Sequence, residues 1–392
     1  MSIPVYFWFP ILGSIGVGFI FMSAPPVADQ FMIMFGVGYG GLSLFLSAIY
    51  WTHAAAQVPA GLLVDRIGIF HSLFVSIALC VAGSLGPLIQ PDNLAVAISF
   101  RLILGVSTGM MFLLFIKILT LLAPSGQVAR AQGLQGAAFC LGTMLPYLTI
   151  PHAGASGWMA AYFSGAIFCA ILGVCIVYLP KVPLRESRTK ADAAQIWQAT
   201  KAIATSRPIW FLGCCHGVSF GTMLTIGNWL PAILVDVRTG SAIEDWAVAA
   251  SALLLVGTLG RVFSGDVIRL MPRQILLLRA ALGIGVLYAL LALANSPAFV
   301  LAPAMLLALL CGSTYATILT LTTNTASPTY VATAVGFMNM IANGVNIILI
   351  LTLGITRELF GGFGPGLSLA ALAAIGLGIW GRSIDWPGKE KA

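Results

Sequence analysis

Three basic residues, Arg101, Lys117 and Arg261, fall inside long apolar stretches of the sequence. A charge in such a stretch is costly and is by default a sign of function. The acidic residues, by contrast, all fall in the shorter polar segments between these stretches or in the tails. Because an unpaired buried cation is strongly destabilised, the sequence predicts that an anionic small molecule supplies the missing negative charge.

Arg261, in the segment GTLGRVFSG, is the strongest candidate for that contact. Its planar guanidinium suits a carboxylate or another oxyanion. Aligning the two halves of the chain places it about eight residues, or roughly 12 Å, from the inner end of its helix. Snorkelling of the side chain to the membrane interface is the alternative for Arg261, and it is the favoured interpretation for Lys117. For Arg101, snorkelling and a structural or coupling role are equally supported.

Uncharged polar residues also occur in the apolar stretches. His53 and His216 are able to carry a coupling proton near neutral pH, or they pack between helices. Asn339, Asn343 and Asn346 follow an i, i+4, i+7 spacing, which puts them on one face of one helix. That face either lines a cavity or forms hydrogen bonds between helices.

The elements that must position these residues are membrane spans. Hydrophobic residues make up 59% of the 392 residues, charged residues only 8%, and the mean hydropathy is +1.00, whereas soluble domains carry about 25% charge. The runs do not alternate, so they predict helices rather than barrel strands. Twelve of them are near spanning length: 4–24, 39–62, 70–90, 94–122, 132–150, 158–180, 208–231, 246–265, 273–295, 298–322, 330–354 and 363–381.

One long polar segment divides the chain into two halves of six spans. We expect an N-terminal bundle at 1–180, a linker at 181–207 and a C-terminal bundle at 208–392. With the N-terminus inside, fourteen basic residues face the cytoplasm and two face outward, so the positive-inside rule puts both termini in the cytoplasm. The membrane is then the plasma membrane, or the inner membrane in a bacterium. The net charge of +7 lies mostly in these loops, which argues against nucleic-acid binding.

The segment AGLLVDRIGIF, between the second and third runs, resembles the signature G-x-L-x-D-R-x-G-R-[RK] of the major facilitator superfamily. Gly61, Asp65, Arg66 and Gly68 match, but Ile69 and Phe70 replace the last two basic residues. The resemblance implies that Asp65 and Arg66 form a cytoplasmic latch. We expect Asp65 near the start of the third helix, where the helix dipole favours a carboxylate.

Further segments support the same resemblance. RLILGVSTG, with Arg101, Gly105 and Gly109, is similar to the superfamily's R-x-x-x-G pattern. TIGNWLPAILVD resembles a segment of organic-anion and cyanate-type carriers and places Asn228 at an outer gate or, alternatively, at a simple helix end. In monocarboxylate, oxalate and nitrate carriers of the superfamily, an arginine on the eighth helix binds the anion, which implies that role for Arg261. The second arginine of nitrate carriers is replaced by Gln57, so nitrate is disfavoured.

The sequence thus predicts an all-α secondary transporter of twelve helices in two pseudo-symmetric bundles, working by alternating access on a small anion, most simply a monocarboxylate. The expected substrate-binding residues are Arg261, Gln57, His216, Tyr315, Asn339 and Asn343. The expected coupling or gating residues are His53, Arg101, Lys117, Asn228, Asp65 and Arg66. Protons are a candidate coupling ion, with anion exchange as the alternative.

Other functions are compatible with the same sequence. A carrier or exporter of neutral or cationic compounds is the main alternative, and a transporter-like receptor or scaffold is a further one. The chain shows no nucleophile–base pairing, phosphate loop or metal cluster in its sequence. We therefore expect a monomeric protein in a lipid bilayer that is not an enzyme and has no cofactor, metal site or nucleic-acid partner.

Overall fold

The computed structural model describes residues 7–123, 128–176, 201–238, 240–326 and 331–386, and this part of the chain is helical without a β-strand. Ten of its segments are long and apolar enough to cross a membrane. One of these, Gly133–Ile176, contains two helices, and α3 (Tyr39–Ile67) is a further helix of 29 residues. Together they give the predicted twelve spanning helices and confirm the all-α membrane fold.

The chain forms two compact units. Unit 1 comprises residues 1–191 and 242–252, and unit 2 comprises residues 192–241 and 253–392. The expected linker at 181–207 lies mostly outside the described residues, which resume at residue 201. The boundaries proposed from the sequence therefore stay predictions.

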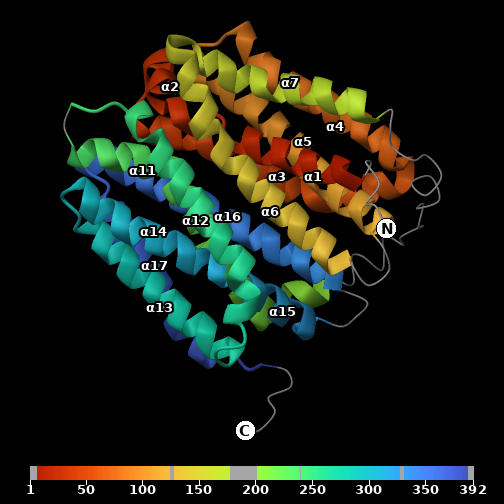
Figure 1. Ribbon diagram of the computed structural model, residues 1–392, viewed down its shortest axis with the longest axis vertical. Coiled ribbons are helices and arrows are strands. Elements are labelled where there is room, and N and C mark those ends of the chain that lie inside the picture. Colours follow the sequence, from red (N-terminus) through yellow and green to blue (C-terminus); the bar gives the residue numbers. More distant parts are fainter. Residues whose placement is uncertain (1–6, 124–127, 177–200, 239, 327–330, 387–392) are drawn as a thin grey trace. The chain divides into compact units, whose positions relative to one another are not determined.

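Unit 1 is a bundle of long helices joined by short turns (Figure 1). Its helices are α1 (Trp8–Phe21), α2 (Ala28–Phe35), α3, α4 (Ile69–Leu85), α5 (Leu94–Leu122), α6 (Val128–Thr149) and α7 (Gly157–Ile176). Helix α5 packs on α3 and on α4, and α1 packs on α6. Gly105 and Gly109 of α5 permit the first contact, because a Cβ atom at Gly109 would lie 2.7 Å from the carbonyl oxygen of His53. Small residues at such crossings let helix backbones approach closely.

Unit 2 contains α10 (Arg207–His216), the π-helical turn η5 (Gly217–Gly221), α11 (Thr222–Val237), most of α12 (Ala247–Val267), α13 (Arg273–Ala292), α14 (Pro297–Ser313), α15 (Tyr315–Thr325), α16 (Val331–Phe360) and α17 (Gly364–Trp380). Helices α12 and α14 approach each other at glycines. A Cβ atom at Gly312 would collide with the carbonyl oxygen of Gly257 and would lie 2.8 Å from the amide nitrogen of Arg261. The backbone of α12 at Arg261 is therefore held directly against α14.

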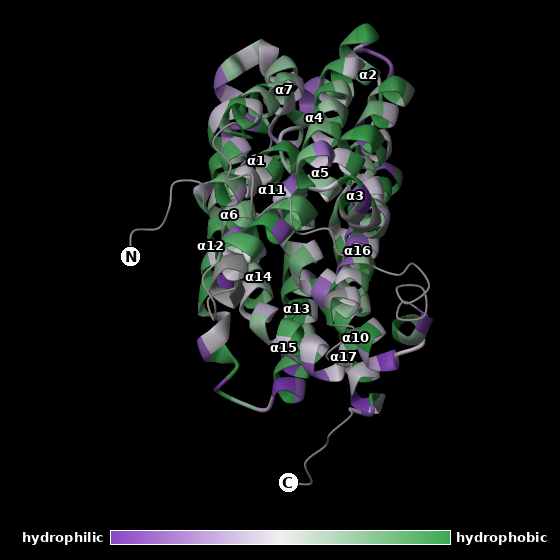
Figure 2. Cartoon of the chain, turned by 90° about the vertical axis from the view of Figure 1, so that its right-hand side faces the viewer, coloured by the Kyte–Doolittle hydropathy of each residue, from purple (hydrophilic) through white to green (hydrophobic). Residues whose placement is uncertain are grey.

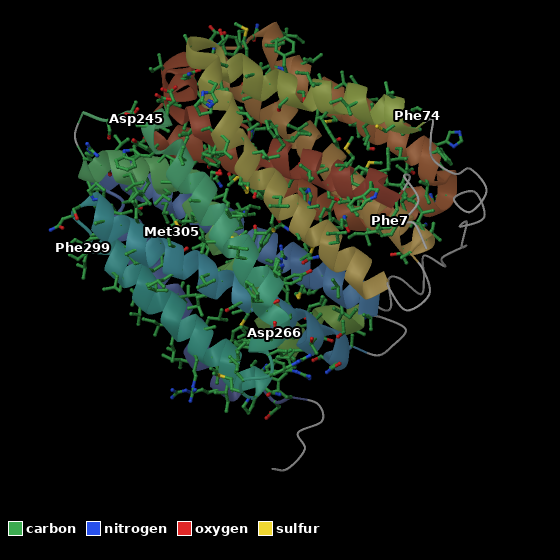
Figure 3. The ribbon with its side chains drawn as sticks, viewed as in Figure 1. Phe7, Phe74, Asp245, Asp266, Phe299 and Met305 are labelled. Atoms are coloured by element: carbon green, nitrogen blue, oxygen red, sulfur yellow. The ribbon has the colours of Figure 1, made fainter. Side chains whose placement is uncertain are left out.

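The helices are apolar over most of their length, and the hydrophilic residues gather near their ends (Figure 2). Large apolar side chains such as Phe74 and Phe299 are 57% and 67% exposed and point outward (Figure 3). Asp245 and Asp266 lie at the two ends of α12 (Figure 3). A surface that is apolar around the middle of its helices and polar at their ends suits a lipid bilayer.

The structure corrects two expectations about acidic and basic residues. Asp65 and Arg66 lie in the last turn of α3, whereas Asp65 was expected near the start of the next helix. The C-terminal end of a helix dipole favours Arg66 and not a carboxylate. The turn to α4 is the single residue Gly68, whose φ of 84° is a backbone conformation suited to glycine. All acidic residues were expected in the polar segments or tails, and two basic residues in outward-facing loops. Asp236 and Arg357, which belong to these two groups, instead lie in α11 and α16 and form an ion pair of 2.8 Å.

Candidate functional site

Arg261 of α12 packs against two aromatic rings in unit 2. Its guanidinium carbon lies 3.7 Å from the centre of the Tyr315 ring and 4.9 Å from the centre of the Phe220 ring. Such cation–π contacts hold a guanidinium in a fixed direction and are stronger where water is scarce. We call Arg261, Phe220, Tyr315 and His216 the arginine–aromatic cluster.

The depth of these residues shows which way the arginine side chain extends. Helix α12 ends at Val267, so Arg261 is about 9 Å from the helix end and not the roughly 12 Å expected from the repeat. Tyr315 is ten residues before the end of α15, about 15 Å along its helix. The backbone of Arg261 lies beside Gly312 of α14, and Tyr315 comes three residues after Gly312. The side chain of Arg261 therefore extends toward the C-terminal ends of these helices, and snorkelling stays an alternative.

The π-helical turn η5 places His216 and Phe220 beside the arginine. The His216 ring is stacked on the Phe220 ring, with centroids 5.5 Å apart and an angle of 11° between the planes. It also lies 6.1 Å from the Tyr315 ring. A π turn inserts one extra residue and turns the following side chains around the helix axis, which is why such turns recur at functional sites. His216 is buried, and its Nδ1 atom has no hydrogen-bond partner among the described residues.

The helix break between α14 and α15 positions Tyr315. Helix α14 ends at Ser313 and α15 begins at Tyr315, with Thr314 between them. The hydroxyl of Thr314 donates a hydrogen bond of 2.8 Å to the carbonyl oxygen of Cys311 and satisfies a backbone acceptor at the break. Tyr315 thus occupies the first position of a new helical segment, in contact with α12.

The amide face of α16 only partly follows the prediction. Asn346 is buried, and its Oδ1 atom accepts a hydrogen bond of 2.8 Å from the hydroxyl of Thr225 on α11. Asn343 instead donates to the backbone carbonyl oxygen of Asn339, at 2.9 Å, within α16. Asn339 and Asn343 are half-buried. Of the two roles left open from the sequence, bonding between helices applies to Asn346.

Two predicted residues of unit 1 lie on one face of α3. His53 is buried, its Nδ1 atom is 3.2 Å from the hydroxyl oxygen of Thr108, and its ring packs edge-on against Phe21 at 4.7 Å. These contacts are those of a residue that joins α3 to α5 and α1. Gln57 follows one turn later and is half-buried. The coupling role of His53 and the binding role of Gln57 stay predictions.

The remaining predicted residues are spread over both units. Lys117 is half-buried, five residues before the end of α5. Asn228 donates a hydrogen bond of 2.9 Å to the carbonyl oxygen of Leu224 in its own helix. Helix α11 continues through Pro231 to Val237, so no helix end occurs near Asn228. Arg66 is exposed, and the side chain of Asp65 lies outside the described residues.

Two residues with contacts near the candidate site, Phe220 and Thr225, are not among those predicted from the sequence. Phe220 is one helical turn after His216, a spacing visible in the sequence but without an obvious chemical signal. Thr225 bonds to a residue on another helix, and only the packing of α11 on α16 reveals that contact.

Unit 2 also has a cavity of about 390 Å³ near the ends of α12 and α15. It is lined by residues such as Arg273, Asn324 and Trp386, and Arg261 does not line it.

Comparison with known proteins identifies the family. A model of the Major Facilitator Superfamily matches residues 9–351, most of the chain. The chain belongs to the Major Facilitator Superfamily. It is therefore an integral, multi-pass membrane transporter that works by alternating access, and this membership argues for transport over catalysis.

Solved structures show the same fold for this superfamily member. The alignment with the nucleoside transporter NupG covers 97% of this chain and 99% of the NupG chain, with a TM-score of 0.77 and 14% identity. The xylose transporter XylE from E. coli has a TM-score of 0.73 and 14% identity, covering 98% of this chain and 97% of its own. A bacterial homologue of the human lysosomal transporter Spinster has a TM-score of 0.74 at 14% identity, covering 96% and 94%. No curated protein sequence matches this chain.

Proposed function

We propose that this transporter carries a small organic anion, most simply a monocarboxylate, and that Arg261 is its principal contact. The observation that supports this proposal most directly is the guanidinium held 3.7 Å from the Tyr315 ring inside a spanning helix. A cation kept at that depth is costly unless it has a function.

The chemistry of the arginine–aromatic cluster suits a carboxylate. Aromatic rings contact the flat face of a guanidinium, whereas a carboxylate is bound through the N–H groups at its edge. The two contacts are therefore compatible, and the rings hold the edge in a defined direction. Such a site binds two carboxylate oxygens through parallel charge-assisted hydrogen bonds.

His216 adds a group able to take part in coupling. It lies in the same cluster, and its Nδ1 atom has no hydrogen-bond partner among the described residues. A histidine of this kind accepts a proton that enters with the anion, or donates a hydrogen bond to the anion itself. We propose proton-coupled transport, with exchange of one anion for another as the alternative. Asn339 and Asn343, in the same unit, remain candidates for further polar contacts, and the binding role of Gln57 in unit 1 stays a prediction.

The test is uptake of a labelled monocarboxylate into proteoliposomes, together with thermal melting of the purified protein in the same anion. Arg261→Gln removes two or more charge-assisted hydrogen bonds, each worth about 1.5 to 3 kcal/mol. We therefore expect at least roughly hundredfold weaker apparent affinity. Arg279→Gln is the matched control, since Arg279 is exposed on α13, and it should behave as the unmodified protein. Unchanged anion uptake by Arg261→Gln would contradict the proposal.

A second candidate cargo is a neutral, ring-bearing solute. Phe220, Tyr315 and His216 gather three rings at one place, and rings of this kind stack on planar or sugar-like ligands. The similar structures named above include a nucleoside transporter and a xylose transporter. This candidate predicts that Arg261→Gln retains uptake of the neutral solute, while Tyr315→Leu loses it. Binding without any uptake would instead indicate a receptor.

A further inference from the structure

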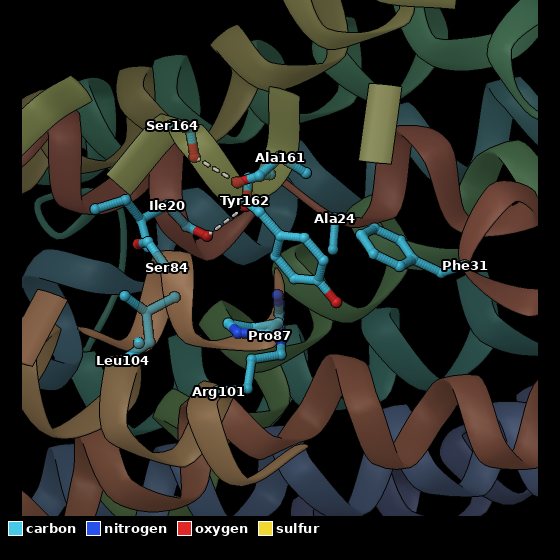
Figure 4. A pocket seen from close by; sticks show the side chains of 12 residues that line it. Ile20, Ala24, Phe31, Ser84, Pro87, Arg101, Leu104, Ala161, Tyr162 and Ser164 are labelled. Atoms are coloured by element: carbon cyan, nitrogen blue, oxygen red, sulfur yellow. Dashed lines mark hydrogen bonds between the residues drawn. The ribbon is translucent and has the colours of Figure 1, made fainter. Parts of the chain in front are cut away.

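Unit 1 contains a small cavity beside α5 (Figure 4). Residues of α1, α2, α4, α5 and α7 line it, and the two that carry its chemistry are Arg101 and Tyr162. Arg101 is seven residues after the start of α5, about 10 Å along the helix. The cavity is separate from the arginine–aromatic cluster, which belongs to unit 2.

The polar atoms at this cavity are buried and unsatisfied. Arg101 is 4% exposed and Tyr162 is 6% exposed. The Nε and Nη2 atoms of Arg101 and the hydroxyl of Tyr162 find no hydrogen-bond partner among the residues that the structure describes. Nearly all buried polar groups in proteins are hydrogen-bonded, so several such atoms at one cavity need a physical reason.

The charge of Arg101 is only weakly compensated by its neighbours. Its guanidinium carbon lies 4.5 Å from the centre of the Phe45 ring, and Arg101 forms no ion pair with an acidic side chain among the described residues. A cation–π contact offsets part of the cost of burying a charge but leaves the N–H groups at the guanidinium edge without acceptors. A negative acceptor would satisfy both the charge and the N–H groups.

The size of the cavity restricts the occupant. Its volume is about 10 Å³. This is room for roughly one water molecule, which favours a compact, monatomic anion over a larger one such as phosphate. Two of the hydroxyl groups on its wall are already committed, because Ser164 donates to the carbonyl oxygen of Ala161 at 2.7 Å and Ser23 donates to that of Ile20 at 3.0 Å.

We propose that this cavity binds one chloride ion, held by the N–H groups of Arg101 and the hydroxyl of Tyr162. Chloride is a compact monatomic anion, somewhat larger than water, and it accepts hydrogen bonds from donors of both kinds. A water molecule would satisfy the donors but would leave the buried positive charge uncompensated. The bound ion joins α5 to α7 and neutralises Arg101 within unit 1, so its role is structural and does not depend on the cargo.

The experiment compares thermal melting of the full-length protein in sodium chloride and in sodium gluconate at equal ionic strength. Gluconate is itself a monocarboxylate, so the comparison is also made in the Arg261→Gln protein, which lacks the proposed cargo contact. A ligand that binds only the folded state raises the melting temperature with its concentration, so we expect a saturable rise of the Arg261→Gln protein in chloride alone. Tyr162→Phe removes one donor with little change in shape, and the half-saturating chloride concentration should increase about tenfold. Arg101→Gln should abolish the rise.

Two controls separate this site from other effects. Tyr147→Phe makes the same substitution at another buried tyrosine of unit 1, which does not line the cavity, and it should keep the full response. Arg261→Gln should also keep it, so failure of the proposed cargo and failure of the chloride site remain distinguishable. Crystals grown in sodium bromide should show an anomalous peak between Arg101 and Tyr162.

Equal melting of the Arg261→Gln protein in chloride and gluconate would overturn the proposal and indicate that the cavity holds water. A chloride response that survives in both Tyr162→Phe and Arg101→Gln would overturn it as well, since the ion would then bind elsewhere. A bromide peak away from the cavity would have the same consequence.

Discussion

The contact between α12 and α14 makes a quantitative prediction for Gly312→Ala. The added Cβ atom would lie 2.8 Å from the amide nitrogen of Arg261 and 3.0 Å from the carbonyl carbon of Gly260, and closer still to the carbonyl oxygen of Gly257. These are backbone atoms, which cannot rotate away as a flexible side chain would. Ordinary contact begins near 3.4 Å, so α12 must retreat by about 0.6 Å at Arg261.

The energy of that displacement follows from known costs of overpacking. Inserting a methyl group into a close-packed contact costs about 1 to 3 kcal/mol, while replacing glycine by alanine inside a helix returns about 1 kcal/mol. We therefore expect a net loss of up to about 2 kcal/mol in the free energy of unfolding. Since the displaced backbone carries Arg261, the affinity for the cargo should fall together with the stability.

Gly265→Ala is the matched control. Gly265 lies on the same helix, close to Arg261, but a Cβ atom there meets nothing within 4 Å. This variant should be as stable as the unmodified protein or slightly more stable. The stabilities of Gly312→Ala and Gly265→Ala are compared by thermal and denaturant unfolding in detergent, and their activities by uptake into proteoliposomes. If Gly312→Ala were as stable and as active as Gly265→Ala, the close approach of the two helices would be refuted.

Two further predictions concern contacts between α11 and α16. Thr225→Val removes the hydroxyl that donates to Asn346 at 2.8 Å. Because a buried amide then loses its partner, the free energy of unfolding should fall by about 1 to 2 kcal/mol. Thr225→Ser keeps the hydroxyl and should melt at a temperature close to that of the unmodified protein. For the ion pair of Arg357 and Asp236, whose side chains are 22% and 19% exposed, a double-mutant cycle with Arg357→Gln and Asp236→Asn should give a coupling free energy of about 1 kcal/mol that weakens with salt. A coupling near zero would show that the pair contributes nothing.

The fold is largely readable from the sequence because the bilayer imposes a simple rule. Each span needs about 20 apolar residues with all of its backbone hydrogen bonds satisfied internally. The apolar stretches around Arg101 and Arg261 therefore predict helices directly. The segment containing Gly61, Asp65, Arg66 and Gly68 then indicates the superfamily. The expected position of Asp65 was nevertheless wrong, because a helix can continue to the residue before Gly68 without any change in hydropathy.

The candidate site is less readable, for a reason that lies in the same composition. A span that is apolar all around gives no periodic signal of which face meets a neighbouring helix. The sequence therefore names Arg261, Tyr315 and His216 as polar or aromatic residues in spans but cannot place them together. Their contact depends on the π-helical turn at Gly217–Gly221 and on the break before Tyr315.

The sequence by itself determined that this chain has twelve spans and basic residues within them, because length and polarity are properties of the chain. Only the tertiary structure decided which atoms those charges meet. Arg261 lies against Tyr315 and Phe220, and Arg101 faces a small cavity with Tyr162. These partners come from helices far apart in the sequence, and the rotation of each helix about its own axis, set by packing, selects them.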